Sequence, residues 1–145
     1  MAETLFGAIA EKFEDSPRLK VSIPGGLWNG IAQERVVKPF CVLISLGSTP
    51  MWMTGDGTKQ NQGPYIEEEH FEFRVRSDDD ATVFVGMKDL MDAFDWCNLT
   101  IASEQQQTVI GVKRTNKIGP FKLSDNPGEW QGNVEYLIWN QNELP

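Results

Sequence analysis

Apolar and polar residues alternate along residues 71–76, where Phe71, Phe73 and Val75 are separated by charged residues. A period of two is that of a β-strand with one buried face. The period then changes, because the apolar residues of 83–94 recur at intervals of three and four, which is the stripe of an amphipathic helix. The sequence therefore predicts a strand followed by a helix, and the helix must bury its stripe against the sheet that contains the strand.

The predicted helices have recognisable ends. Asp78, Asp79 and Asp80 precede the helix of residues 83–94, where carboxylates accept the free N–H groups of a first turn and favour its positive dipole end. These acids lack the spacing of an oxygen-ligand calcium loop, so capping accounts for them. Residues 5–13 show a second helical stripe, and Pro17 is expected to end that segment.

Other segments are short runs with β-strand character, joined by turn-forming residues. The run 36–46 is apolar on nearly both faces and begins near Pro39, which predicts a central strand. Glycine and proline residues make 21–32 an expected loop. The further predicted strands are 99–101, 108–113 and 129–139, with a turn at 104–107.

The last predicted strand has two features of its own. Gly132 leaves a gap that a large neighbouring side chain or a helix is expected to fill. Leu137 and Trp139 lie on the face opposite Val134, Tyr136 and Ile138, and this second apolar face needs a cover. A neighbouring subunit is one candidate for that cover.

Residues 47–65 show no periodicity and contain several glycines and prolines. Connections this long in compact domains are either functional or unstructured. Met51, Trp52 and Met53 lie near the start of this segment. One interpretation is a long mobile hairpin, and the other is an arm that orders against a partner, because an exposed Met-Trp-Met cluster is costly in water.

The order of these elements predicts an α+β fold in residues 1–145, taken as a single domain. A mostly antiparallel sheet is expected to carry two main helices on one face, with the long loop extending from the sheet.

Two cysteines, Cys41 and Cys97, are too few for a disulfide framework and are expected as buried thiols. The chain has no secretory signal and no membrane-spanning run, which predicts folding in a reducing cytoplasm and no membrane partner.

Charge is distributed unevenly along the chain, whose net charge is −8. That balance argues against a surface that grips phosphates. Residues 67–80 contain seven acids beside Arg74 and Arg76, whereas 105–124 contain basic residues and no acid. Opposite patches allow copies to pair head to tail, although both segments can also be ordinary solvated faces. The basic candidates in the second segment are Lys113, Arg114 and Lys117.

Residues that commonly carry catalysis do not converge in this sequence. His70 is the only histidine, and it alternates with Phe71 on the charged side of its strand, where an exposed histidine among charges is expected. A metal ion at His70 would need further ligands that the pattern does not supply. We therefore expect no enzymatic activity, no cofactor and no metal site.

Several sequence segments resemble those of the tail-completion or tail-terminator proteins of long-tailed bacteriophages. They are ETLFGAIAEKF at 3–13, the loop with Trp28, Asn29 and Gly30, and the strand that begins Lys38-Pro39-Phe40 and continues CVLISL. HFEFRVRSDDD at 70–80 and WQGNVEYLIW at 130–139 extend the resemblance over almost the whole chain.

The resemblance implies a virion structural protein that forms a ring, usually hexameric, at the head-proximal end of the tail. Its partners would be further copies of itself, the tail tube protein and the head connector or stopper protein. Genomic DNA would pass through the lumen without specific binding, and assembly would take place in the host cytoplasm. The family contributes no catalytic residues.

Three other functions remain open from the sequence. The first is another head-tail connector or tube component, which the same pattern fits. The second is a monomeric adaptor or ligand-binding domain whose long loop closes on a peptide or small molecule. The third, ranked last, is a hydrolase that uses His70 and nearby carboxylates.

Overall fold

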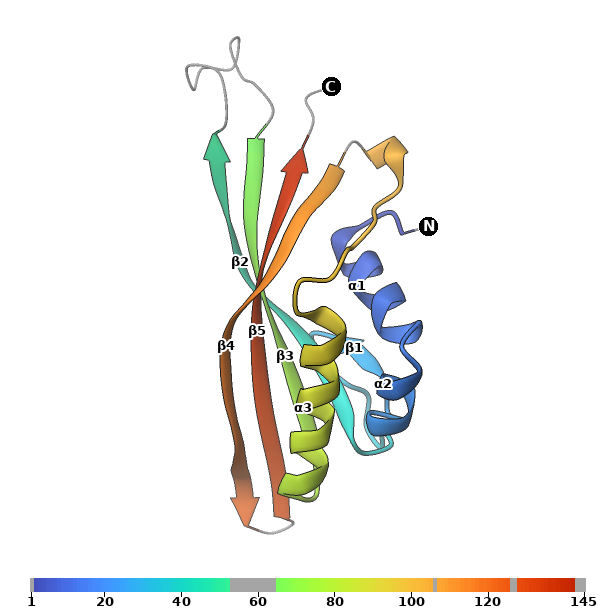
Figure 1. The fold of residues 1–145 in the computed structure, drawn as a ribbon. Coiled ribbons are helices and arrows are strands. Elements are labelled where there is room, and N and C mark those ends of the chain that lie inside the picture. Colours follow the sequence, from blue (N-terminus) through green and yellow to red (C-terminus); the bar gives the residue numbers. More distant parts are fainter. Residues whose placement is uncertain (1, 53–64, 106, 126–127, 143–145) are drawn as a thin grey trace.

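A computed structural model describes residues 2–52, 65–105, 107–125 and 128–142. In these residues one strongly twisted sheet carries helices on one of its two sides (Figure 1). The strand order is β1-β2-β3-β5-β4, in which β1 runs parallel to β2 and the other pairs are antiparallel. The strands are β1 (Leu27–Asn29), β2 (Phe40–Trp52), β3 (Tyr65–Ser77), β4 (Gln107–Asp125) and β5 (Gly128–Asn142). The helices are α1 (Leu5–Glu14), α2 (Pro17–Ser22) and α3 (Asp80–Phe94), with a 3₁₀ turn, η1 (Ser103–Gln105). The expected α+β class is confirmed.

The helix caps follow the predicted chemistry. Asp79 is the N-cap of α3, and its carboxylate accepts the backbone N–H of Thr82 at 2.7 Å. A hydrogen bond from the Thr82 hydroxyl, followed by this backbone bond, lowers the pKa of Asp79. Asp78 instead forms an ion pair with Lys38 at 2.9 Å.

Among the described residues, no helix is both long and apolar enough to cross a lipid bilayer.

The segment after α1 differs from the expectation. Pro17 does not end a helix but begins α2, where its missing N–H and fixed φ suit the first helical position. The expected loop at 21–32 also contains the end of α2 and the short strand β1. β1 is stabilised by pairing with Cys41, Val42 and Leu43 of β2, a long-range contact that leaves no local periodicity.

The long antiparallel pair of β2 and β3 corrects two predictions. Residues 47–52 belong to β2 and pair with β3, so the first part of the predicted loop at 47–65 is a strand. Residues 53–64 of that predicted loop lie outside the described residues. Of the three proposed loop residues, Met51 is exposed at the end of β2, the backbone of Trp52 is in the strand, and Met53 lies outside the described residues. β2 has β1 beside only three of its residues, and β3, between β2 and β5, is the central strand.

β4 is much longer than the predicted strand at 108–113, and its pairing with β5 is interrupted by four register shifts. Each shift breaks the alternation that would reveal a strand in the sequence. The predicted strand at 99–101 is reduced to a single bridge between Ala2 and Ile101. The strand predicted at 129–139 is confirmed as β5.

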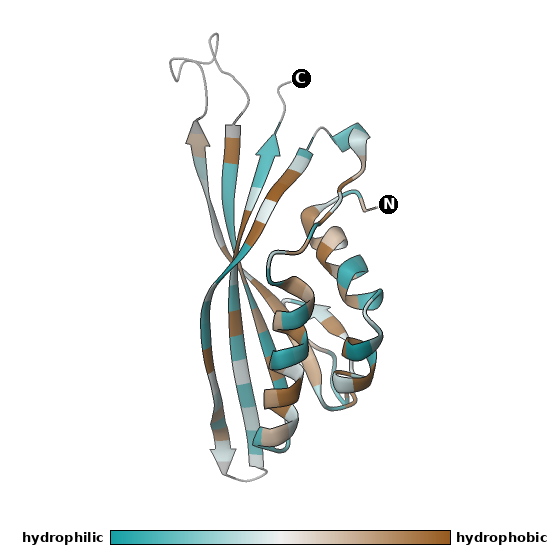
Figure 2. Ribbon diagram, in the orientation of Figure 1, coloured by the Kyte–Doolittle hydropathy of each residue, from teal (hydrophilic) through white to brown (hydrophobic). Residues whose placement is uncertain are grey.

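The core lies between the helices and one side of the sheet, where the apolar stripes are buried (Figure 2). Phe73 of β3, Phe94 of α3 and Tyr136 of β5 form an aromatic cluster with ring centroids 4.8 to 6.2 Å apart. The Tyr136 hydroxyl donates to Asp95 at 2.6 Å.

Cys41 is buried, as expected, and burial raises the pKa of its thiol. Cys97 is only half-buried.

Gly132 of β5 lets side chains of α3 approach the sheet closely. A Cβ at this position would lie 2.0 Å from Sδ of Met87 and 2.9 Å from a methyl group of Val83. Both side chains are fully buried. The gap predicted at Gly132 is therefore filled by a large side chain of the helix.

Gly132→Ala is expected to lower the free energy of unfolding by about 2 kcal/mol, because the added methyl group overlaps Met87 and forces α3 outward. The measurement is urea denaturation followed by circular dichroism. Gly128→Ala is the matched control on the same strand, since its Cβ would have its nearest neighbour 4.0 Å away. Equal losses of stability in the two variants would show that Met87 does not pack as described.

Candidate functional site

The side of the sheet away from the helices carries charged and amide side chains. Phe71, Phe73 and Val75 of β3 pack in the core, so the residues that alternate with them point to the opposite side. We call this side the polar face. It is defined by three cross-strand pairs of β3 and β5: Arg76 with Gln131, Arg74 with Asn133, and Glu72 with Glu135.

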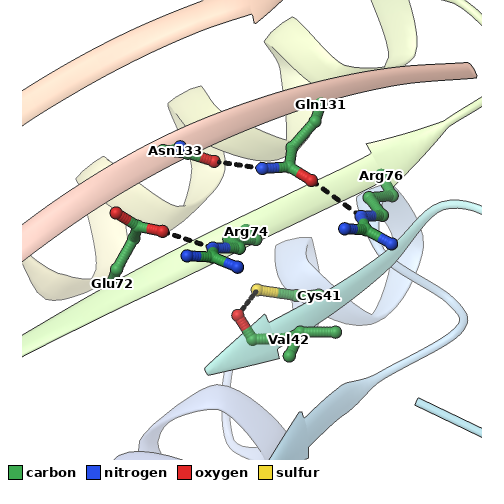
Figure 3. Close-up of polar contacts among 7 residues, drawn as sticks. All are labelled: Cys41, Val42, Glu72, Arg74, Arg76, Gln131 and Asn133. Carbon is green, nitrogen blue, oxygen red and sulfur yellow. Dashed lines mark hydrogen bonds and ion pairs between the residues drawn. The ribbon is translucent and has the colours of Figure 1, made fainter. Parts of the chain in front are cut away.

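Arg76 is held by a chain of amide groups on β5. Its Nε donates to Oε1 of Gln131 at 2.7 Å, and Nε2 of Gln131 donates to Oδ1 of Asn133 at 2.8 Å (Figure 3). Gln131 is only 5% exposed, so its side chain has little freedom to turn away. The guanidinium of Arg76 is therefore fixed in direction.

Arg74 is held by a carboxylate instead. Its Nε donates to Glu72, which is 6% exposed (Figure 3). Glu135 lies across the strand from Glu72. Partial desolvation, and then the hydrogen bond and negative charge of Glu72, raise the pKa of Glu135, while nearby His70 acts in the opposite direction. Glu72 and Glu135 therefore repel each other when both carboxylates are ionised.

A pocket of about 250 Å³ lies beside these two arginines. Its walls are Phe40, Val42 and Ile44 of β2 together with Arg74 and Arg76, and residues 30–33 close one side. Gly30 begins that closing segment with φ 79°, a conformation that favours glycine. The Gly30 N–H donates to the carbonyl of Leu43 at 2.9 Å, which anchors the segment to β2.

The apolar residues predicted on the second face of β5 are on the polar face. Leu137 is half-buried and pairs with His70 on one side and Lys113 on the other. The Trp139 ring lies against Gly111 of β4, where an added Cβ would be 3.2 Å away. Its indole N–H donates to Glu68 at 3.4 Å. Neighbouring strands of the same subunit therefore supply part of the cover that Trp139 needs.

The three basic candidates on β4, Lys113, Arg114 and Lys117, do not form one patch. Lys113 is exposed on the polar face. Arg114 points to the helix side, where it contacts Met91 and pairs with Asp95 at 3.5 Å. Lys117 is also on the helix side, with Nζ 5.4 Å from the centroid of the Phe84 ring.

The acidic segment is divided in the same way. Glu68 and Glu72 pair with polar-face residues of β5, whereas Glu69 pairs with buried Ile138 on the helix side. The acid-rich β3 and the basic β4 lie in the same sheet with β5 between them. Acidic and basic residues are therefore further apart along the sequence than on the folded surface, where both kinds occur on each side of the sheet.

Sequence reasoning singled out Arg74 and Arg76 but not Gln131, Asn133, Glu135 or the segment 30–33. The alternation of β5 shows which of its residues share a face. The partner of each residue depends on the register between β3 and β5, which no local pattern reveals. His70 lies on the polar face, as its alternation with Phe71 predicted, but it is half-buried where an exposed histidine was expected. In the described part of the chain, no group of three or more His, Cys, Asp or Glu side chains is placed to hold a metal ion.

Comparison with known proteins adds a structural relative. No model of a known protein family matches the chain, and no curated protein matches it in sequence. Among solved structures, the chain is similar to one from the virion of a native gene transfer agent particle, with a TM-score of 0.73. The similarity covers 95% of both chains at 11% sequence identity. The two chains share a fold.

Glu135→Gln is expected to stabilise the protein at neutral pH by about 0.5 kcal/mol, a value limited by solvent screening. Because folding raises the pKa of Glu135, the wild-type residue favours the folded state at pH below its unfolded pKa. That contribution is lost as the pH rises through the folded pKa, so the gain from the substitution shrinks at acidic pH.

The measurement for Glu135 is the urea midpoint at several pH values between 3.5 and 8, a span of roughly one unit below and four above the usual pKa of a glutamate. Glu129→Gln is the control, since Glu129 lies on the same strand and pairs with Ser124. Parallel pH profiles for the two variants would contradict the coupling between Glu135 and Glu72.

Proposed function

We propose that this chain is a structural protein of a phage-type virion and that copies of it form a ring at the head-proximal end of the tail. The observation that carries the proposal is the fold shared with a chain of the gene transfer agent virion over 95% of both chains. The resemblance of the sequence to tail-terminator proteins supports the same role independently of the structural comparison.

The proposed partners are other copies of the chain, the tail tube protein and the head connector or stopper protein. A ring of subunits that each carry a net charge of −8 would repel DNA phosphates. Genomic DNA would then pass through the lumen without specific binding. The ring would act without an enzymatic step, and its assembly would take place in the host cytoplasm.

A second candidate is a different connector or tube component of the same kind of particle. The gene transfer agent particle favours a virion protein in general, and a connector or tube subunit satisfies that likeness equally well. The position of the protein in the particle separates the two candidates. A tail terminator occupies one end of the tube, whereas a tube subunit repeats along its length.

Surfaces for the ring contacts are proposed from exposed residues of the sheet. Lys113 is exposed beside Leu137 on the polar face, and a cation next to an apolar side chain suits the rim of a subunit interface. Arg114 is less suited, because Asp95 holds it and Asp95 also accepts the Tyr136 hydroxyl. Reversing the charge of Arg114 would disturb the monomer as well as any interface.

Ring formation is tested by light scattering after size exclusion across a concentration series, followed by negative-stain imaging. The expected result is a shift toward about six times the 16.4 kDa of one subunit as the concentration rises, or the same shift on addition of tail tubes. A monomer at every concentration that also fails to bind tail tubes would contradict the proposal and favour a monomeric adaptor.

Lys113→Glu is expected to weaken assembly about tenfold, because it places a like charge in an interface of acidic subunits. The folded monomer should be unchanged, since Lys113 is exposed. The measurement is the concentration at half assembly, with thermal unfolding as the check on folding. Lys20→Glu on exposed α2 is the matched charge reversal. The same loss in both variants would indicate an effect of net charge and remove Lys113 from the interface.

A further inference from the structure

We propose that the pocket between residues 30–33 and the polar face binds the carboxylate of an acidic side chain presented by a partner protein. The pocket is a property of one subunit and does not require a ring. Its test is therefore separate from that of the proposed function, and either can fail without the other.

The two guanidinium groups carry the inference. Arg74 and Arg76 both line the pocket, and the hydrogen bonds described for them use Nε, toward Glu72 and Gln131 (Figure 3). An arginine anchored through Nε keeps its terminal amino groups available in a fixed direction. Such a fork matches the two oxygens of a carboxylate.

The supports of both arginines are buried. Glu72 is 6% and Gln131 is 5% exposed, so neither can swing into solvent and release its arginine. The entropy cost of ordering the two arginines is therefore met when the protein folds, before any ligand arrives. A preorganised pair of donors is what distinguishes a binding site from two mobile surface arginines.

The apolar residues that line the pocket indicate what lies next to the carboxylate in the ligand. Phe40, Val42 and Ile44 provide an apolar surface beside the arginines. Ile31 lines the pocket and is 82% exposed, so it offers an uncovered apolar contact at the rim. The ligand that fits is an acidic residue with an apolar neighbour in an exposed protein segment.

The surrounding charges favour a single carboxylate over a nucleic acid. Glu72 is paired with Arg74 and has Glu135 across from it on β5, and the whole chain has a net charge of −8. A polyanion binds through many phosphates at once and would meet these acids. A single carboxylate needs only the two guanidinium groups.

The experiment is a titration of the full-length protein followed by NMR of the arginine Nε–H signals. The probe is N-acetyl-Leu-Glu-Leu-amide, and N-acetyl-Leu-Gln-Leu-amide is the uncharged control. The expected result is a saturable shift of the Arg74 and Arg76 signals with the Glu peptide and at least tenfold weaker binding of the Gln peptide, as loss of a charge-assisted pair predicts. Equal binding of the two peptides, or no saturable shift with the Glu peptide, would overturn the proposal.

Three variants separate the site from its surroundings. Arg76→Gln is expected to weaken Glu-peptide binding about tenfold. Arg76→Lys should weaken it nearly as much, because lysine keeps the charge but loses the fork. Arg18→Gln, which removes an exposed arginine of α2 paired with Asp92, should leave the affinity unchanged. Full binding by Arg76→Lys would overturn the two-pronged geometry.

A further variant keeps the test valid if Arg76 substitutions impair folding. Ala32→Glu places a negative charge on the closing segment and leaves both arginines in place, so it should also weaken binding of the Glu peptide about tenfold. Inorganic phosphate and a short oligothymidine are titrated in parallel. Tighter binding of either one than of the Glu peptide would contradict a carboxylate ligand.

Discussion

α3 is held against the sheet where Met87 lies over Gly132, and the positions of the other elements follow from this contact. A side chain at residue 132 would occupy the space of Met87 Sδ, so the close approach depends on glycine. About two turns further along α3, Phe94 packs against Phe73 of β3 and Tyr136 of β5. The helix thereby contacts two adjacent strands and fixes their relative register. A slip of one residue would turn every buried side chain of a strand outward.

The polar face is a direct consequence of that register. With Phe73 and Val134 buried under α3, Arg74 and Asn133 must point away from the helices. Gln131 then reaches Arg76, and Glu72 reaches Arg74. β1 contributes to the pocket as well. Its parallel pairing with β2 places residues 30–33, which follow β1, beside the same two arginines. Packing on one side of the sheet thus preorganises polar groups on the other.

Local periodicity was sufficient to predict β3, α3, β5 and the cap at Asp79, because each has one buried face and a clear chemical boundary. It was insufficient for β1, which is three residues long, and for β4, whose bulges interrupt the alternation. Arg74 and Arg76 could be selected from the sequence as charged residues on a strand. Gln131, the partner of Arg76, lies 55 residues from it, so the pocket emerges only from tertiary pairing.

Incorporation into a particle is measured most directly by quantitative mass spectrometry of virions or virus-like particles purified from cells that carry the gene for this chain. A virion structural protein is expected in the purified particles at a constant ratio to the other tail proteins across independent preparations. A tail-terminator ring further predicts a small fixed number of copies per particle, whereas a tube subunit would be far more abundant. Presence in the cell lysate with absence from the purified particles would contradict a structural role in the virion.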